Sequence, residues 1–202
     1  MSNKTNSKKR YQQTFFQKNK KWIYTGSALV IIIIVILMNG NSLFGKGDNE
    51  GSLPSNYVGS IGNESVTAPN FNLPTIAGKH LKLSDYKGKV LIVDFWATWC
   101  PPCRRGIPDL IELKRKYGQT GFDVIGISVD TDTKADVSSF VQRMGINYPV
   151  VYAEGNVTER YGGIESIPTS FVIDKTGKIV SSYQGFNPIS VYEDQIKKLL
   201  AK

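Results

Sequence analysis

The sequence contains very little cysteine and histidine, with two cysteines and one histidine among 202 residues. Two cysteines exclude a framework of several disulfides. Together with a single histidine, they also leave too few soft ligands for a structural zinc site. The histidine, His80, lies in a predicted hairpin, 20 positions before the first cysteine, Cys100. A hydrolase built on a cysteine–histidine pair therefore lacks a suitably placed base.

Acidic residues are absent from the first 21 positions, which hold seven cations. The formal net charge of the whole chain is +8, so these seven leave only +1 for the remaining residues. A basic terminus on a nearly neutral body offers no continuous surface for a phosphate backbone, and we expect no nucleic-acid partner. The cations are Lys4, Lys8, Lys9, Arg10, Lys18, Lys20 and Lys21.

Charge of either sign is absent from residues 22–38, which are rich in consecutive isoleucine and valine. As a helix this segment would span about 25 Å, close to the ~30 Å hydrocarbon core of a bilayer. We expect a single-pass anchor in the cell membrane, with the basic end in the cytoplasm and residues 39–202 outside. A cleaved signal peptide stays open as the alternative, with a weak cleavage site at Gly40-Asn41-Ser42 and no following cysteine to accept a lipid.

Apolar periodicity is absent from residues 39–66, which are rich in glycine, serine and asparagine. Such a composition is typical of a flexible tether. The predicted organisation is therefore a cytoplasmic tail over 1–21, a transmembrane anchor over 22–38, a linker over 39–66 and one globular domain over 67–202. A domain of this size supports a single core. We expect it to be monomeric.

The globular part alternates predicted strands and helices. Residues 90–97 and 122–129 are apolar on both faces, which is typical of central parallel strands. The order of elements predicts an α/β fold with a central mixed sheet flanked by helices. The other predicted elements are a hairpin of 70–73 and 79–83, a helical turn from Ser84, helices over 101–117, 134–144, 157–161 and 190–201, and strands over 148–152, 169–173 and 179–184.

The two cysteines belong to the segment Trp99-Cys100-Pro101-Pro102-Cys103, between a predicted buried strand and a predicted helix. Unpaired N–H groups at a helix start favour a thiolate at the first cysteine. The second cysteine lies three residues on, within reach to resolve a mixed disulfide. Both prolines are tolerated there, because the N–H groups of a first helical turn have no intrahelical partner. The pattern predicts thiol–disulfide exchange, with Cys100 attacking and Cys103 resolving.

The cysteine pair has two other interpretations, a structural disulfide and half of a zinc site. A structural disulfide across so short a loop would constrain the unfolded chain little. Half of a zinc site would need further cysteines or histidines. Dithiol exchange needs neither a metal nor an organic cofactor, so we expect none beyond the redox-active disulfide Cys100–Cys103.

A carboxylate interrupts the predicted central strand at Asp94, six positions before Cys100. Burying a carboxylate costs several kcal/mol unless it is protonated or paired. One interpretation pairs Asp94 with a lysine or with water. The other, which we favour, is an acid of raised pKa behind the active site that takes the proton of Cys103 when this cysteine attacks the mixed disulfide.

Ile167-Pro168 precedes a predicted strand, where a proline can serve as the strand entry. A trans proline of this kind is one interpretation. The other is a cis proline packed against Cys100, which leaves the backbone of Ile167 free to pair with an incoming peptide. We therefore predict a substrate-docking face, formed by Trp99, Pro101, Pro102, Ile167 and Pro168.

The acidic stretch from Asp130 to Asp136 has some likeness to a calcium-binding loop. It lacks the glycine expected at the sixth position and the glutamate expected at the twelfth, where Val141 stands. We interpret these aspartates as caps of the helix that follows.

Together these motifs resemble the thioredoxin superfamily, in particular its extracytoplasmic TlpA/ResA-like branch. The resemblance covers roughly residues 67–202 and implies a thioredoxin-like fold and a thiol–disulfide oxidoreductase. Cys100 and Pro168 lie 68 positions apart, more than in plain thioredoxin. The surplus matches the strand–helix insert of this branch, around residues 131–157. The matching segments are Ala68–Phe71, Leu83–Lys89, Asp94–Cys103, Pro108, Ile167–Thr169 and Gly185.

The chain departs from ResA-like members in one respect. Those proteins carry a glutamate where Gly106 stands and lack the strand aspartate, whereas Asp94 follows the plain-thioredoxin arrangement. This difference leaves the exchange chemistry unchanged and argues against carrying over the role of ResA in cytochrome c maturation, which stays an open pathway.

The resemblance implies protein disulfides as substrates. No histidine lies between the cysteines to favour the reduced state, so we expect a reductant that draws electrons from a membrane thiol-electron carrier. A disulfide-forming oxidase and a redox-inactive binding or chaperone module are the alternatives.

Overall fold

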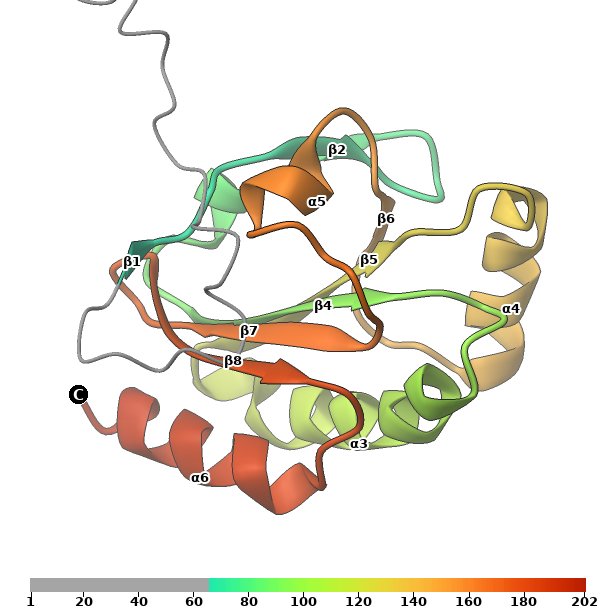
Figure 1. Cartoon of the computed structure of the whole chain (residues 1–202). Coiled ribbons are helices and arrows are strands. Elements are labelled where there is room, and N and C mark those ends of the chain that lie inside the picture. The colour runs from blue at the N-terminus through green and yellow to red at the C-terminus, as the bar shows by residue number, and fades with distance from the viewer. Residues whose placement is uncertain (1–65) are drawn as a thin grey trace, which may run out of the picture. The chain divides into compact units, whose positions relative to one another are not determined.

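The computed structural model describes residues 66–202 (Figure 1). The predicted tail over 1–21, the predicted anchor over 22–38 and the predicted linker over 39–66, apart from its last residue, lie outside the described residues. Within 66–202 no helix is long and apolar enough to cross a bilayer. The elements are β1 Val66–Thr67, β2 Asn72–Pro74, β3 His80–Lys82, η1 Leu83–Tyr86, β4 Val90–Trp96, α3 Pro101–Tyr117, η2 Gly118–Thr120, β5 Phe122–Ser128, η3 Lys134–Asp136, α4 Val137–Met144, β6 Val150–Tyr152, α5 Val157–Arg160, β7 Thr169–Ile173, β8 Lys178–Gln184 and α6 Ile189–Leu200.

A six-stranded mixed sheet with the order β1-β8-β7-β4-β5-β6 forms the centre of the domain. β4 pairs in parallel with β5, and β5 in parallel with β6. On its other edge β4 pairs antiparallel with β7. Every residue of β4 and β5 is buried, which fits two strands covered on both faces. The predicted α/β fold with a central mixed sheet is confirmed.

Side chains alternate across β4 and divide the core into two layers. Ile92 and Trp96 pack with apolar residues of α3, α4 and α6 on one face. Val93 and Phe95 pack on the other face with the β2–β3 hairpin and with α5, whose neighbour Tyr161 is fully buried. Figure 1 shows α3 and α6 together on one side of the sheet and the hairpin and α5 on the opposite side. Because both layers pack against β4, the position of the strand and of its carboxyl end is fixed.

The structure differs from the sequence predictions at two elements. The two-residue strand β1 was not predicted, because it is joined to β8 by backbone pairing and is too short to show alternation. The predicted helix over 134–144 is divided into the 3₁₀ turn η3 and the α-helix α4, which ends at Gly145 in a left-handed conformation with φ of 66°. The insert predicted around 131–157 is present as η3, α4 and β6, with β6 extending the sheet at its edge.

Candidate active site

The start of α3 places both cysteines at the carboxyl end of β4. Cys100 is the N-cap residue of α3, with Pro101 and Pro102 in the first turn. Its backbone is extended, and its sulfur accepts a hydrogen bond from the backbone N–H of Cys103 over 3.2 Å. The sulfur therefore holds the capping position that a serine or aspartate oxygen usually takes. At this position the N–H groups and the positive end of the helix dipole favour a thiolate once the pair is reduced.

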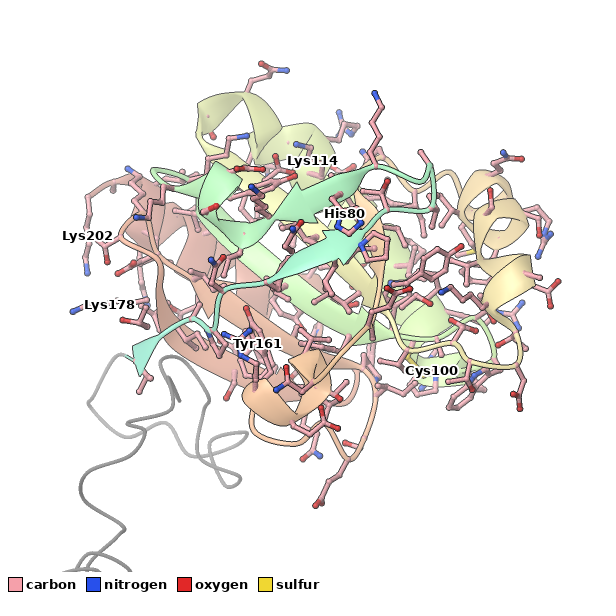
Figure 2. All side chains as sticks on the ribbon, turned by 90° about the horizontal axis from the view of Figure 1, so that it is seen from above. His80, Cys100, Lys114, Tyr161, Lys178 and Lys202 are labelled. Atoms are coloured by element: carbon pink, nitrogen blue, oxygen red, sulfur yellow. A yellow bond between two sulfur atoms is a disulfide. The ribbon has the colours of Figure 1, made fainter. Side chains whose placement is uncertain are left out.

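The cysteines are joined as a disulfide with a Cα–Cα distance of 5.3 Å, within the usual range for such a bond. Cys100 and Cys103 are each only 2 % exposed. Figure 2 shows Cys100 at one end of the domain, with Lys178 and Lys202 at the other. The predicted pairing of the two cysteines at a helix N-terminus is confirmed.

The loop before β7 lies against the first cysteine. The Ile167–Pro168 peptide bond is cis, as the second of the two interpretations predicted. The Sγ of Cys100 lies 3.6 Å from the backbone oxygen of Ile167, so the two segments meet at the disulfide. Pro168 itself is buried, while Ile167 is half-buried.

The predicted docking residues lie around the disulfide and differ in their exposure to solvent. Trp99 is 59 % exposed, which is unusual for so large an apolar side chain. Pro101 is also exposed, and Pro102 is half-buried. The structure therefore brings the predicted residues together around Cys100, with Trp99 as the prominent apolar side chain.

Asp94 lies in the middle of β4, with Gly126 of β5 and Ser170 of β7 opposite it in the sheet. The side chain is 6 % exposed, and burial raises the pKa of its carboxyl from 3.8 to about 8. Within residues 66–202 no salt bridge reaches this carboxylate, so the lysine-paired interpretation is not supported. Desolvation without a compensating cation is the cause of the shift.

The charge of Asp94 raises the pKa values of two tyrosines. Tyr148 is buried, and its pKa is raised well above the usual value, first by burial and then by Asp94. Burial also raises the pKa of Tyr192 of α6, the 2.7 Å hydrogen bond with Ser170 partly offsets this, and the charge of Asp94 raises the pKa further. Tyr148 and Trp96 each hold a buried polar atom without a hydrogen-bond partner in the described part of the chain. Asp94 thus faces a mostly apolar region with few groups to stabilise its charge.

Comparison with known proteins decides the family. The model of the Redoxin family matches residues 63–198, two thirds of the chain. The chain belongs to the Redoxin family.

Curated relatives of this Redoxin-family protein carry a more specific description. The chain is 33 % identical over 168 residues to "Thiol-disulfide oxidoreductase ResA" of Bacillus cereus (strain ATCC 10987 / NRS 248), covering 83 % of this chain and 94 % of the relative. It is 30 % identical over 183 residues to the protein of the same name in Bacillus subtilis (strain 168), covering 88 % and 92 %. The predicted TlpA/ResA-like resemblance is confirmed.

Solved structures agree with this assignment. A thiol:disulfide interchange protein of the thioredoxin family from Chlorobium tepidum superimposes with a TM-score of 0.63 and 35 % identity, covering 68 % of this chain and 97 % of that chain. The Redoxin-family protein is therefore a thiol–disulfide oxidoreductase with a thioredoxin-like fold. Oxidoreductases of this class need no cofactor for thiol–disulfide exchange. Residues 66–202 contain no cluster of three or more potential metal ligands.

Asp130 has a role at this site that sequence reasoning missed. Its carboxylate accepts hydrogen bonds from the backbone N–H of Thr98 over 3.1 Å and from the Ser128 hydroxyl over 2.8 Å. The hydroxyls of Thr98 and Thr133 also donate to it. Because Thr98 lies two residues before Cys100, the buried Asp130 fixes the loop that leads to the cysteines.

The helix-capping interpretation of the acidic stretch is therefore wrong. Asp136 is the N-cap residue of α4 but makes no capping hydrogen bond with its side chain. Asp130 follows β5, whose carboxyl end lies beside that of β4 because the two strands are parallel. That position at the shared strand edge was the signal that could have connected Asp130 to the active site.

A second cavity lies away from the disulfide. It has a volume of about 310 Å³ and is lined by residues near the start of β4 and the β7–β8 turn, among them Tyr86, Lys89 and Asp174. These residues lie at the amino end of β4, opposite the end that leads to Cys100. Neither cysteine lines this cavity, so we place the active site at the disulfide.

Proposed function

We propose that the protein reduces disulfides of other proteins on the outer side of the cell membrane, held there as a monomer by residues 22–38. The observation that carries this proposal is a buried, disulfide-bonded cysteine pair at a helix start, with a carboxyl of raised pKa on the strand that precedes it. The thiol–disulfide oxidoreductase class of the relatives supports it. Cytochrome c maturation remains one pathway that such a reductant would serve.

In the proposed reaction the reduced Cys100 thiolate attacks a substrate disulfide and forms a mixed disulfide, releasing the first substrate thiolate. Cys103 then loses its proton to ionised Asp94 and attacks the Sγ of Cys100. The Cys100–Cys103 bond forms, the mixed disulfide breaks, and two electrons have passed to the substrate. A membrane thiol-electron carrier returns the pair to the dithiol form.

The docking face positions the substrate for this exchange. Trp99 is exposed beside the disulfide and offers apolar area to a substrate chain, while the backbone of Ile167 lies next to Cys100. A substrate segment that pairs with the Ile167 backbone would place its own sulfur near the Sγ of Cys100. Pro101, Pro102 and Pro168 give this face a fixed shape, because proline restricts the backbone.

The direction of electron flow is tested by the equilibrium reduction potential of Cys100–Cys103, measured against glutathione or dithiothreitol. We expect a value nearer to the roughly −270 mV of thioredoxin than to the roughly −120 mV of a strong oxidant. The protein should also reduce insulin in a turbidity assay. A potential above about −150 mV, with catalysis of disulfide formation in a reduced substrate, would favour the oxidase alternative and contradict the proposed direction.

The proposed topology is tested with single cysteines in a full-length background that lacks Cys100 and Cys103. Ser190→Cys places a thiol at an exposed position of the domain, and Ser7→Cys places one in the basic tail. We expect a membrane-impermeant maleimide to label Ser190→Cys in intact cells and Ser7→Cys only after lysis. Labelling of both, or of neither, before lysis would contradict the anchored arrangement with the tail inside.

A further inference from the structure

A small cavity connects the two groups between which the proposed proton transfer occurs. It has a volume of about 20 Å³ and is lined by Asp94, Cys103 and Tyr192, together with Gly106 and Phe186. This volume is enough for one water molecule, which needs at least about 10–15 Å³. The carboxyl of Asp94 and the side chain of Cys103 therefore share a space that one water can occupy.

Phe186 lies at the opening of this cavity. It is 42 % exposed and is the one exposed residue among those that line the cavity. Its ring lies over Gly106 of α3, where an added Cβ would be 3.6 Å from the ring. The guanidinium carbon of Arg105 lies 5.8 Å from the ring centre on the solvent side of α3. A large apolar side chain thus lies where the cavity meets solvent.

The Phe186 segment is attached to the loop that contacts Cys100. The N–H of Gly185 donates a 2.7 Å hydrogen bond to the oxygen of Pro168. Gly185 has a φ of 77°, a left-handed conformation that favours glycine and turns the chain out of β8 toward α6. Figure 1 shows this connection running beside α3. The position of the Phe186 ring is therefore set by the active-site loop on one side and by α3 on the other.

We propose that Phe186 is the cover of this cavity and that a water entering beside its ring carries the proton between Asp94 and solvent. The inference rests on the proposed role of Asp94 as proton acceptor. After Cys103 has attacked, Asp94 holds the proton that Cys103 lost, and the substrate has left as a thiolate. Asp94 returns to its ionised form when the cavity water takes this proton to solvent, where the thiolate is protonated. Phe186 is a positioning residue, since it limits the access of water to Asp94 and takes no part in the sulfur chemistry.

The groups around Asp94 include no cation that would set its pKa, so the burial of the carboxyl, to which Phe186 contributes, is the controlling feature. The titratable side chains facing it are Cys103 from α3, Tyr192 from α6 and Tyr148 from the segment before β6. The Tyr192 hydroxyl is already bonded to Ser170 of β7, and β5 presents only Gly126 opposite Asp94. No cation contributes to the pKa shift of Asp94, and burial is its cause. Changing the cover changes that burial and leaves the neighbouring charges in place.

The test is Phe186→Ala in the full-length protein, with the Asp94 carboxyl followed by carbon-13 NMR in aspartate-labelled samples. We expect the pKa of Asp94 to fall from about 8 toward 3.8, because water reaches the carboxyl more easily. With both cysteines present, the pH midpoint for release of the mixed disulfide by Cys103 should move to lower pH in parallel, by roughly one pH unit. Phe186→Leu, which keeps an apolar cover, should stay close to wild type in both measurements.

Trp99→Ala is the matched control, because it removes the other large exposed apolar side chain of residues 66–202 without changing the lining of the cavity. It should leave the Asp94 titration unchanged while weakening substrate binding. Equal Asp94 titrations in wild type, Phe186→Ala and Phe186→Leu would overturn the inference. Phe186→Val supplies an intermediate shift and serves as the test if the alanine variant does not fold.

Failure of the cover and failure of the proposed function give different results. If Asp94→Asn slows release of the mixed disulfide and Phe186→Ala changes neither titration nor midpoint, the cover is wrong and the role of Asp94 stands. If Asp94→Asn leaves the release rate unchanged, Asp94 is not the proton acceptor, and both that role and the cover fail. Disulfide reduction by the protein is decided separately, by the reduction potential and the insulin assay.

Discussion

The Cys103→Ser protein is expected to accumulate mixed disulfides with its substrates, whereas Cys100→Ser is not. With Cys103 absent, the thiolate of Cys100 still attacks a substrate disulfide, but no second thiol releases the product. Turnover with a protein disulfide should fall by at least ~10³-fold in either variant, since the two sulfurs act as one unit. Non-reducing electrophoresis of protein from intact cells shows the adducts, and mass spectrometry identifies the trapped partners.

The double variant with serine at both positions is the control for adducts that form outside the active site. Burial alone does not decide which sulfur attacks, because Cys100 and Cys103 are equally shielded in the disulfide form. The assignment depends instead on the N-cap position of Cys100 and its contact with the Ile167 loop. Equal trapping by both single variants, or by neither, would contradict it.

Asp94→Asn is expected to stabilise the oxidised protein at pH 8 relative to wild type. The folded-state pKa of Asp94, about 8, lies above its ordinary value of 3.8, so the folded state binds the proton more tightly than the unfolded state. Wild-type stability is therefore highest below about pH 4 and falls as pH rises toward 8. Asparagine has a similar shape and never ionises, so its stability does not follow this trend.

The measurement is the free energy of unfolding by denaturant between pH 4.5 and 8.5. The advantage of Asp94→Asn should grow by about 1.4 kcal/mol per pH unit across this window and total roughly 3–5 kcal/mol. Any fixed packing cost of the buried amide shifts both ends equally, so the slope is the informative quantity. Asp123→Asn is not a suitable control, because Asp123 accepts hydrogen bonds from Lys89 and Lys114. Asp132→Asn, at an exposed position, should show no such slope.

The same substitution should slow the release of the mixed disulfide by roughly a hundredfold at pH 8, because the proton acceptor for Cys103 is gone. In wild type the release rate should rise with pH up to about 8, as Asp94 becomes ionised. Gained stability combined with lost rate is typical of a buried functional group. If Asp94→Asn lost stability at pH 8 and kept the wild-type rate, Asp94 would be an ordinary core residue.

Local sequence patterns predicted most of the fold. The central strands were recognisable because they are apolar on both faces, and the predicted helix over residues 101–117 agrees with α3 because a strand precedes it and Gly118 follows it. Hydrophobic periodicity is a property of neighbouring residues, so it can be read without knowing the fold. Hydrophobic periodicity does not predict the short strand β1, since its pairing with β8 depends on residues more than a hundred positions away.

The reactive pair and its acid could also be predicted from sequence. Cys100 and Cys103 are close because of their spacing, and Asp94 is conspicuous because a carboxylate is costly in a buried strand. The direction of its pKa shift followed from burial alone, and the structure agrees with it. The sequence left both the trans and the cis form of Ile167–Pro168 open. The structure has the cis form, and the Ile167 backbone lies against Cys100.

What the sequence determined by itself, then, is the chemistry of the Cys-Pro-Pro-Cys segment, the alternation of strands and helices and the carboxyl behind the pair. Only the tertiary structure brought Asp130 to Thr98, 32 positions apart, and Phe186 to Gly106 over the cavity that Asp94 and Cys103 share. Such contacts join distant segments, and the local sequence of one segment does not indicate which other segment it will contact. They depend on strand order and on helix packing, so residues that fix the loop or cover the acid become visible only when the chain is folded.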